Sequence, residues 1–97
     1  MKVMISQPMN GKTNEQIIEE RKSIVDLLEK EGHQIINTIF EIEAPEDVDT
    51  AMYYLAKSIE AMSKADAVVF LPGWESARGC RIEYQAAQSY GKFIKII

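Results

Sequence analysis

The sequence predicts a single α/β domain over residues 1–97, with three layers (α/β/α) built around a four-stranded parallel sheet. Three observations support this class. Apolar runs alternate with amphipathic helical segments in the order β-α-β-α-β-α-β, the links between them are short, and 97 residues leave room for one hydrophobic core. Because parallel crossovers are right-handed, this alternation places helices on both faces of the sheet. We expect the strand order 2-1-3-4.

The first strand and helix are marked by apolar and turn-forming residues. Lys2–Ile5 is a short apolar run followed by turn residues, which is typical of a central parallel strand. Thr13 is the expected N-cap of the first helix, and Gln16 completes a capping box. Gly32 ends this helix as a C-cap glycine. The spacing of apolar residues predicts an inward face made of Ile17, Ile18, Arg21, Ile24, Val25 and Leu28.

The remaining elements alternate in the same way. A second strand is predicted over His33–Ile39, and an acidic loop over Glu41–Asp49 follows it. Asp49 or Thr50 caps a second helix, whose predicted inner face consists of Met52, Leu55, Ile59 and Met62. The last three elements are a strand at Ala67–Leu71, a helix at about Gly79–Tyr90 and a strand at Phe93–Ile97.

Composition argues against several classes of function. The formal net charge is -4 at pH 7 and no basic stripe is visible, which argues against nucleic-acid binding. Cys80 is the single cysteine, so the chain forms no internal disulfide and no Cys-rich metal site, and we expect no metal and no cofactor. No apolar stretch approaches a membrane span and no signal peptide is visible, so we expect a cytoplasmic protein that does not bind membranes.

Two loops are expected to meet at the carboxyl edge of the sheet. In the order 2-1-3-4 the winding direction reverses between the first and third strands, and open α/β sheets bind ligands beyond the strand ends at such a point. The loops that follow these two strands are Ser6–Thr13 and Pro72–Arg78. This topology predicts a small-molecule site there, with a nucleoside or nucleotide as the expected ligand.

Glu83 is the candidate catalytic residue. It lies four residues after Gly79 and four before Ala87, so the three share one helix face on which two members are small. A carboxylate positioned in this way can act as a nucleophile or an electrostatic stabiliser at a glycosidic carbon. The alternative is that Glu83 is an ordinary acid near a helix N-terminus, where the helix dipole favours acids.

The second loop offers candidate contacts to an anion and to a base. Gly73 and Gly79 let backbone N–H groups approach an anion beside Arg78, and Ser76 is a candidate cap for the third helix. Trp74 is a candidate for stacking on a base, with an oligomer contact or a lid over the core as alternatives. The predicted substrate-binding residues are Ser6, Pro8, Met9, Asn10, Gly11, Gly73, Trp74, Ser76, Arg78 and Gly79.

The sequence predicts neither a histidine-activated serine or cysteine nucleophile nor a glycine-rich phosphate-binding motif. His33 is the single histidine and begins a strand at the opposite end of the sheet, so it cannot serve Cys80 or a serine as a base. The first loop has one glycine, Gly11, and therefore lacks both the dinucleotide-binding fingerprint and the phosphate-loop spacing.

Residues Tyr54–Ile97 resemble the nucleoside 2-deoxyribosyltransferase-like superfamily, which includes deoxynucleoside 5′-monophosphate N-glycosidases. The segments that carry this resemblance are SIEAMSKADAVVFLPG and GCRIEYQAAQSYGKFI. Over nearly its whole length the chain is similar to short bacterial and phage members of unassigned function, through ISQPMNGK and PGWESARGCRIEYQAA.

The resemblance implies a flavodoxin-like (Rossmann-like) sheet, a homodimer or larger homo-oligomer, and a glutamate that attacks C1′ of a deoxyribose. That glutamate falls on Glu83. Two other groups of the family are missing, because the expected tyrosine falls on Met4 and the expected aspartate falls on Ser58. The chain is therefore expected to be an N-glycosidase or a deoxyribosyltransferase, or else a non-catalytic nucleotide-binding module that senses or sequesters its ligand. A weaker alternative is a subunit-interaction protein that uses its aromatic surfaces.

Overall fold

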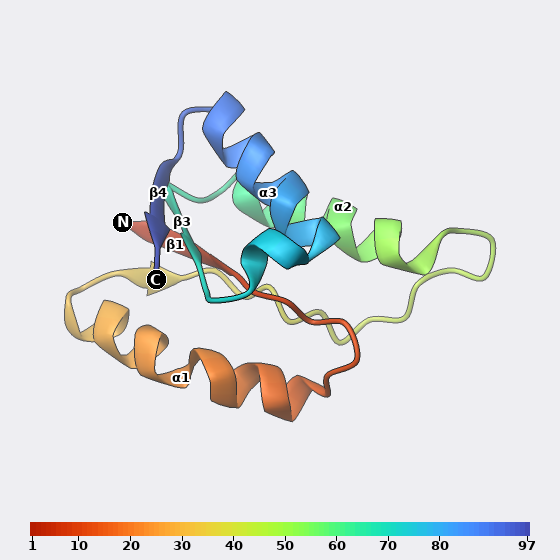
Figure 1. The fold of residues 1–97 in the computed structure, drawn as a ribbon, viewed down its shortest axis with the longest axis horizontal. Coiled ribbons are helices and arrows are strands. Elements are labelled where there is room, and N and C mark those ends of the chain that lie inside the picture. Colours follow the sequence, from red (N-terminus) through yellow and green to blue (C-terminus); the bar gives the residue numbers. More distant parts are fainter.

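A computed structural model describes residues 1–97 and contains a four-stranded parallel sheet between two helical layers (Figure 1). Helix α1 covers one face of the sheet, and helices α2 and α3 cover the other. In chain order the elements are β1 (Lys2–Ser6), α1 (Asn14–Lys30), β2 (Gln34–Ile35), α2 (Thr50–Met62), β3 (Ala67–Phe70), the 3-10 turn η1 (Trp74–Ser76), α3 (Arg78–Ser89) and β4 (Phe93–Ile96).

The strand order is β2-β1-β3-β4, which confirms the predicted topology. β1 and β3 lie at the centre, with Val3 opposite Ala67 and Ser6 opposite Phe70. All four residues of β3 are buried, as the apolar run predicted, because helices cover this strand on both faces. The two central strands end at the same edge, so the loops that follow them start side by side.

Strand β2 is shorter than the predicted His33–Ile39, because it covers only Gln34–Ile35. Beyond it, the Ile36 amide still donates to the Val3 carbonyl at 2.9 Å. The chain then turns: the Asn37 side chain accepts from the Ile39 amide at 3.0 Å, and the Thr38 hydroxyl donates to the Ile5 carbonyl at 3.3 Å. These side-chain hydrogen bonds take the place of backbone hydrogen bonds between β2 and β1, so the strand ends early.

Helix α1 begins as predicted, because Thr13 and Gln16 form the complete capping box. Gly32 follows the helix with a φ of 91°, as expected of a glycine just past a helix end. The inward face is narrower than predicted, since Ile18 is 51% exposed. Each residue advances about 100° around a helix, so Ile18 lies beside the buried stripe rather than on it. The buried residues of α1 are Ile17, Arg21, Ile24 and Leu28.

Helix α2 is capped by Asp49, whose carboxylate accepts from the Met52 amide at 2.9 Å. Met62, at the other end of the helix, is buried as predicted, but Met52 is 68% exposed. The reason is visible in Figure 1, where the N-terminal half of α2 extends past the edge of the sheet. Met52 therefore has no sheet beneath it.

Helix α3 starts one residue earlier than predicted, at Arg78, and ends at Ser89. The predicted cap at Ser76 is wrong, because Ala77 occupies the N-cap position and makes no side-chain cap bond. Ser76 instead belongs to η1, whose backbone leads directly into the helix. The first turn of α3 therefore keeps its amides free of side-chain caps.

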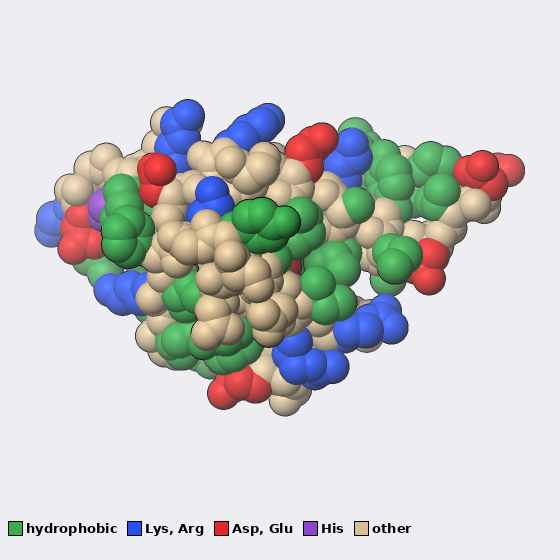
Figure 2. All heavy atoms as spheres, turned by 90° about the horizontal axis from the view of Figure 1, so that it is seen from above, with side chains coloured by type: hydrophobic (Ala, Val, Ile, Leu, Met, Phe, Trp, Pro, Cys, Tyr) green, Lys and Arg blue, Asp and Glu red, His purple; other side chains and the backbone are tan.

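The acidic segment between β2 and α2 projects from one end of the molecule. Figure 2 shows acidic side chains at this tip, and Glu46 and Asp47 are exposed there. The Tyr54 hydroxyl of α2 donates to the Ile42 carbonyl at 2.5 Å and ties the base of the segment to the helix. None of the helices combines the length and the apolar character that crossing a membrane requires.

Candidate functional site

The two predicted loops meet over the carboxyl ends of β1 and β3. Gly73 has a φ of 91°, and a Cβ placed on it would lie 3.3 Å from Cγ of Pro8, so the loops are in close contact. Between them and α2 opens a cleft of about 1140 Å³. The close approach explains why a glycine stands at position 73: it supplies both the left-handed backbone and the missing side chain.

Glu83 lies in this cleft and is only 7% exposed. The Ser6 hydroxyl, at the end of β1, donates to Glu83 Oε1 at 2.7 Å. Burial raises the pKa of the Glu83 carboxyl, while hydrogen bonds from Ser6 and Ser58 and the charge of Arg21 act in the opposite direction. The side chain is therefore an acid that points into the cleft and is held by hydroxyl donors from β1 and α2.

Local sequence explains how these two side chains come together. Side chains alternate along a strand, so Met4 and Ser6 point to the face of the sheet that α2 and α3 cover. On α3, Ala87 packs in the core one helical turn beyond Glu83. The small residue lets α3 approach the sheet closely, and Glu83 reaches the end of β1 where the strand changes from apolar to polar.

Arg21 of α1 lies on the other side of the same strand end and is 5% exposed. Its Nε donates to Gln7 Oε1, and its Nη1 donates to the Thr38 hydroxyl at 3.2 Å. Burial lowers the pKa of Arg21 to about 10, and the charge of Glu83 acts against that shift. The guanidinium is therefore still positively charged at neutral pH.

The rim of the cleft carries further polar groups. Lys12 forms an ion pair with Glu20, with Nζ at 2.9 Å from Oε2, and Asn10 lies beside it in the first loop. Arg78, the first residue of α3, also lines the cleft. Arg81 donates to the Glu75 carbonyl at 3.1 Å and does not line the cleft. Two cations, Lys12 and Arg78, thus line the cleft.

Most of the predicted substrate-binding residues line the cleft, and two do not. Those that do are Ser6, Pro8, Met9, Asn10, Gly73, Ser76, Arg78 and Gly79. Gly11 lies outside it, and so does Trp74, whose ring stacks on Tyr84 with a centroid distance of 4.7 Å. Trp74 packs against the core beneath α3, which corresponds to the alternative of a lid over the core.

Sequence reasoning missed several polar residues at the site. Gln7, Thr38 and Cys80 line the cleft, and Arg21 was assigned only to the inward face of a helix. One signal was available, because a cation at an inward helical position is rare unless it is paired. Cys80 lies three residues before Glu83 and so shares its helix face, but nothing in the sequence indicated that Thr38 would face the same cleft.

The other singled-out groups lie elsewhere. His33 is half-buried, with Nδ1 at 3.1 Å from the amino group of Met1, and does not line the cleft. The structure brings together no group of three or more His, Cys, Asp or Glu side chains that could hold a metal ion.

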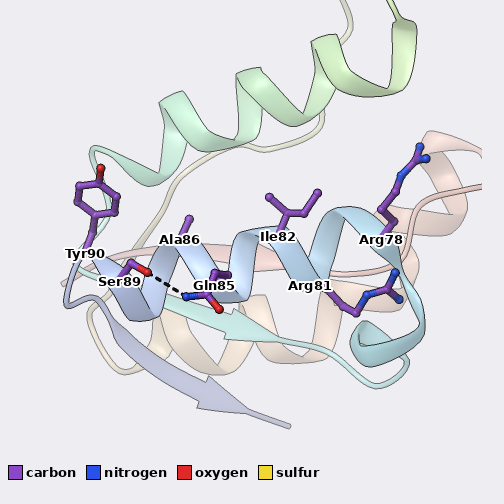
Figure 3. A pocket seen from close by; sticks show the side chains of 7 residues that line it. All are labelled: Arg78, Arg81, Ile82, Gln85, Ala86, Ser89 and Tyr90. Atoms are coloured by element: carbon purple, nitrogen blue, oxygen red, sulfur yellow. Dashed lines mark hydrogen bonds between the residues drawn. The ribbon is translucent and has the colours of Figure 1, made fainter.

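A second, shallower hollow lies along the outer surface of α3. Figure 3 shows that its lining comes from one helix and the residue after it: Arg78, Arg81, Ile82, Gln85, Ala86, Ser89 and Tyr90. Its volume is about 390 Å³, and the Gln85 side chain donates a hydrogen bond of 3.0 Å to the Ser89 hydroxyl one turn further along the same helix. The hollow carries no acid, so the cleft with Glu83 is the stronger candidate for chemistry.

The fold and the cleft define a small three-layer α/β protein with a buried acid at the carboxyl edge of a parallel sheet. Residues 1–96 match the family model described as "Domain of unknown function (DUF4406)", and the chain belongs to this family. Comparison with curated proteins and with solved structures found no significant match.

Proposed function

We propose that this protein binds a nucleoside or nucleotide in the cleft and cleaves or transfers at its N-glycosidic bond, with Glu83 as the nucleophile. The observation that supports this most strongly is the buried Glu83 carboxyl, held by Ser6 at 2.7 Å inside a cleft of about 1140 Å³. Concave sites with a few convergent polar groups are typical of small-molecule binding. The resemblance to nucleoside 2-deoxyribosyltransferase-like proteins, in which a glutamate falls on the same position, points to the same reaction.

In the proposed reaction, a Glu83 oxygen attacks C1′ of the sugar, and the C1′–N bond breaks as the C1′–O bond forms. The departing base takes the bonding electron pair and a proton from water or a general acid. Water then hydrolyses the glycosyl ester and regenerates the carboxylate; a second base that takes the sugar instead gives transfer. Burial raises the pKa of Glu83, but the hydroxyl donors around it favour the ionised form, which is the form that attacks.

The charged and polar residues that line the cleft favour an anionic substrate. Lys12 of the first loop and Arg78 at the start of α3 both line the cleft, and Asn10 adds an amide from the first loop. The first turn of α3 has no side-chain cap, so its amides, with Gly79 among them, are free to bind an anion. A 5′-phosphate placed there would orient the sugar above Glu83. We therefore expect nucleotides to bind more tightly than nucleosides.

A non-catalytic nucleotide-binding module is the second candidate, because the cleft offers no obvious acid for the departing base. Asp49 is the one other carboxylate that lines the cleft, and it caps α2. Ser58 stands at the position where the resemblance leads us to expect an aspartate. Met4, which stands at the position of the expected tyrosine, is buried in the core. Either a neighbouring subunit of a homodimer or larger homo-oligomer supplies the acid, or the site only binds.

The experiment is to incubate the protein with each deoxynucleoside and its 5′-monophosphate and to quantify free base by chromatography. Glu83→Gln is expected to lower turnover by at least about a hundredfold. Glu19→Gln, which changes an exposed glutamate of α1, is the matched control and keeps full turnover. Undiminished turnover in Glu83→Gln would contradict the assigned nucleophile.

A thermal-shift panel with the same compounds separates the two candidates. Stabilisation by a nucleotide without release of base would favour the binding module, since a ligand that binds the native state raises its stability. No stabilisation by any compound, together with no product, would contradict both candidates.

The expected compartment is the cytoplasm, where the single thiol of Cys80 stays reduced.

A further inference from the structure

Arg21 and Glu83 are the two charged residues of the buried interior, and their charges are opposite. The other buried polar residues are Ser6, Gln7 and Thr38, and each of them bonds to one of these two side chains. We propose that Arg21 is a positioning residue whose buried positive charge favours the ionised form of the Glu83 carboxylate. The catalytic consequence rests on the proposed function, but the electrostatic role does not.

The end of β1 joins the two charges. Ser6 and Gln7 are consecutive and point to opposite faces of the sheet, where Ser6 bonds to Glu83 of α3 and Gln7 bonds to Arg21 of α1. The ion pairs of the structure involve other residues, so Arg21 acts on Glu83 through the low-dielectric interior rather than by direct contact. The arrangement places a fixed cation beneath the floor of the cleft.

Stability alone does not explain this arginine. Its Nη2 is buried and has no hydrogen-bond partner, and an uncompensated buried donor on a charged group is unfavourable. An apolar side chain could fill the same space beside Ile17 and Ile24 without that penalty. What an apolar side chain could not supply is positive charge close to Glu83, where burial otherwise favours the neutral acid.

The other groups around Glu83 supply no comparable charge. Ser58 of α2 is a neutral donor, and the Cys80 thiol of α3 has a pKa raised by burial, so it stays neutral. The remaining charged residues that line the cleft are Lys12, Asp49 and Arg78. Lys12 is paired with Glu20, and Asp49 would oppose ionisation of Glu83. Arg21 is therefore the one buried cation that favours the carboxylate.

The test is a carbon-13 NMR titration of the side-chain carboxyls in protein labelled at glutamate Cδ. The Glu83 resonance is assigned as the one that disappears in Glu83→Gln. In Arg21→Gln, which is neutral but can still form hydrogen bonds, the Glu83 midpoint is expected to move to higher pH. In Arg21→Lys, which keeps the charge, it is expected to stay close to wild type. Lys22→Gln removes an exposed cation one residue away on α1 and is expected to change nothing.

An unchanged Glu83 midpoint in Arg21→Gln would overturn the proposal, and so would equal shifts in Arg21→Gln and Arg21→Lys, which would indicate a packing role. If Arg21→Gln does not fold, the wild-type chain still provides the test: the nitrogen-15 Nε signal of Arg21 should titrate with the same midpoint as Glu83. An Arg21 Nε chemical shift that does not change at the Glu83 midpoint would overturn the proposal.

The activity assay adds a separate readout. If the wild type releases base, we expect kcat of Arg21→Gln to be lower on the order of tenfold at pH values where Glu83 is ionised in the wild type but protonated in the variant. This loss should shrink at higher pH, where Glu83 is ionised in both proteins. A loss that is the same at every pH would contradict the proposal. Failure of the proposed function would appear as no base released by the wild type, and it would leave the NMR result standing.

Discussion

Ser6 and Glu83 lie 77 residues apart in the chain, yet the Ser6 hydroxyl donates a 2.7 Å hydrogen bond to Glu83 Oε1. The contact joins the last residue of a central strand to the helix that follows the second loop. The hydrogen bond is buried, so water screens it much less than a surface contact. The ionisation of Glu83 and the stability of the strand end are therefore coupled.

Ser6→Ala is expected to destabilise the fold by about 1–3 kcal/mol at neutral pH, because it removes one of the hydroxyl donors of a buried carboxylate. Ser6 lowers the pKa of Glu83, so its bond stabilises the ionised form, and the loss should shrink as the pH falls through the pKa of Glu83. Urea unfolding at several pH values measures this. Ser89→Ala removes an exposed hydroxyl and serves as the control. A loss that does not depend on pH would contradict the coupling.

Glu83→Gln is expected to keep or raise stability near pH 8, by up to about 1 kcal/mol, while it abolishes the proposed chemistry. Burial is the largest influence on Glu83 and raises its pKa, so the wild type carries a penalty for ionisation that is present above the folded pKa. That penalty disappears as the pH falls and Glu83 binds a proton, so the advantage of the variant should disappear too. Thermal unfolding of both proteins across pH 4–8 tests this, and a variant that is less stable at every pH would contradict it.

Gly73→Ala is expected to cost about 1–2 kcal/mol for the left-handed backbone and to weaken ligand binding as well. Its new Cβ would lie 3.3 Å from Cγ of Pro8 and would push apart the two loops that form the cleft. Gly32→Ala is a matched control, because Gly32 has the same φ of 91° but nothing within 4 Å of the added carbon. Both variants should lose similar stability, and only Gly73→Ala should lose nucleotide affinity by titration. Equal affinity in both would show that the contact with Pro8 does not shape the cleft.

The fold was largely predictable because it depends on short-range patterns. The apolar runs, the capping box at Thr13 and Gln16, and the glycine after α1 each act within a few residues, and all three occur in the structure. Strand order followed from alternation and handedness. The exceptions were the length of β2, the cap at Ser76 and the exposure of Ile18 and Met52, which depend on what lies opposite each residue in space.

By itself, the sequence determined the layers, the strand order and the two loops that lie at one edge, because periodicity and handedness act locally and repeat along the chain. Only the tertiary structure decided which groups Arg21 meets on the inward face of α1, where the Thr38 hydroxyl accepts a hydrogen bond from the guanidinium, and that Trp74 packs on Tyr84 rather than in the cleft. Those contacts join side chains from separate elements. Their hydrogen bonds and charges depend on distances that no local pattern encodes.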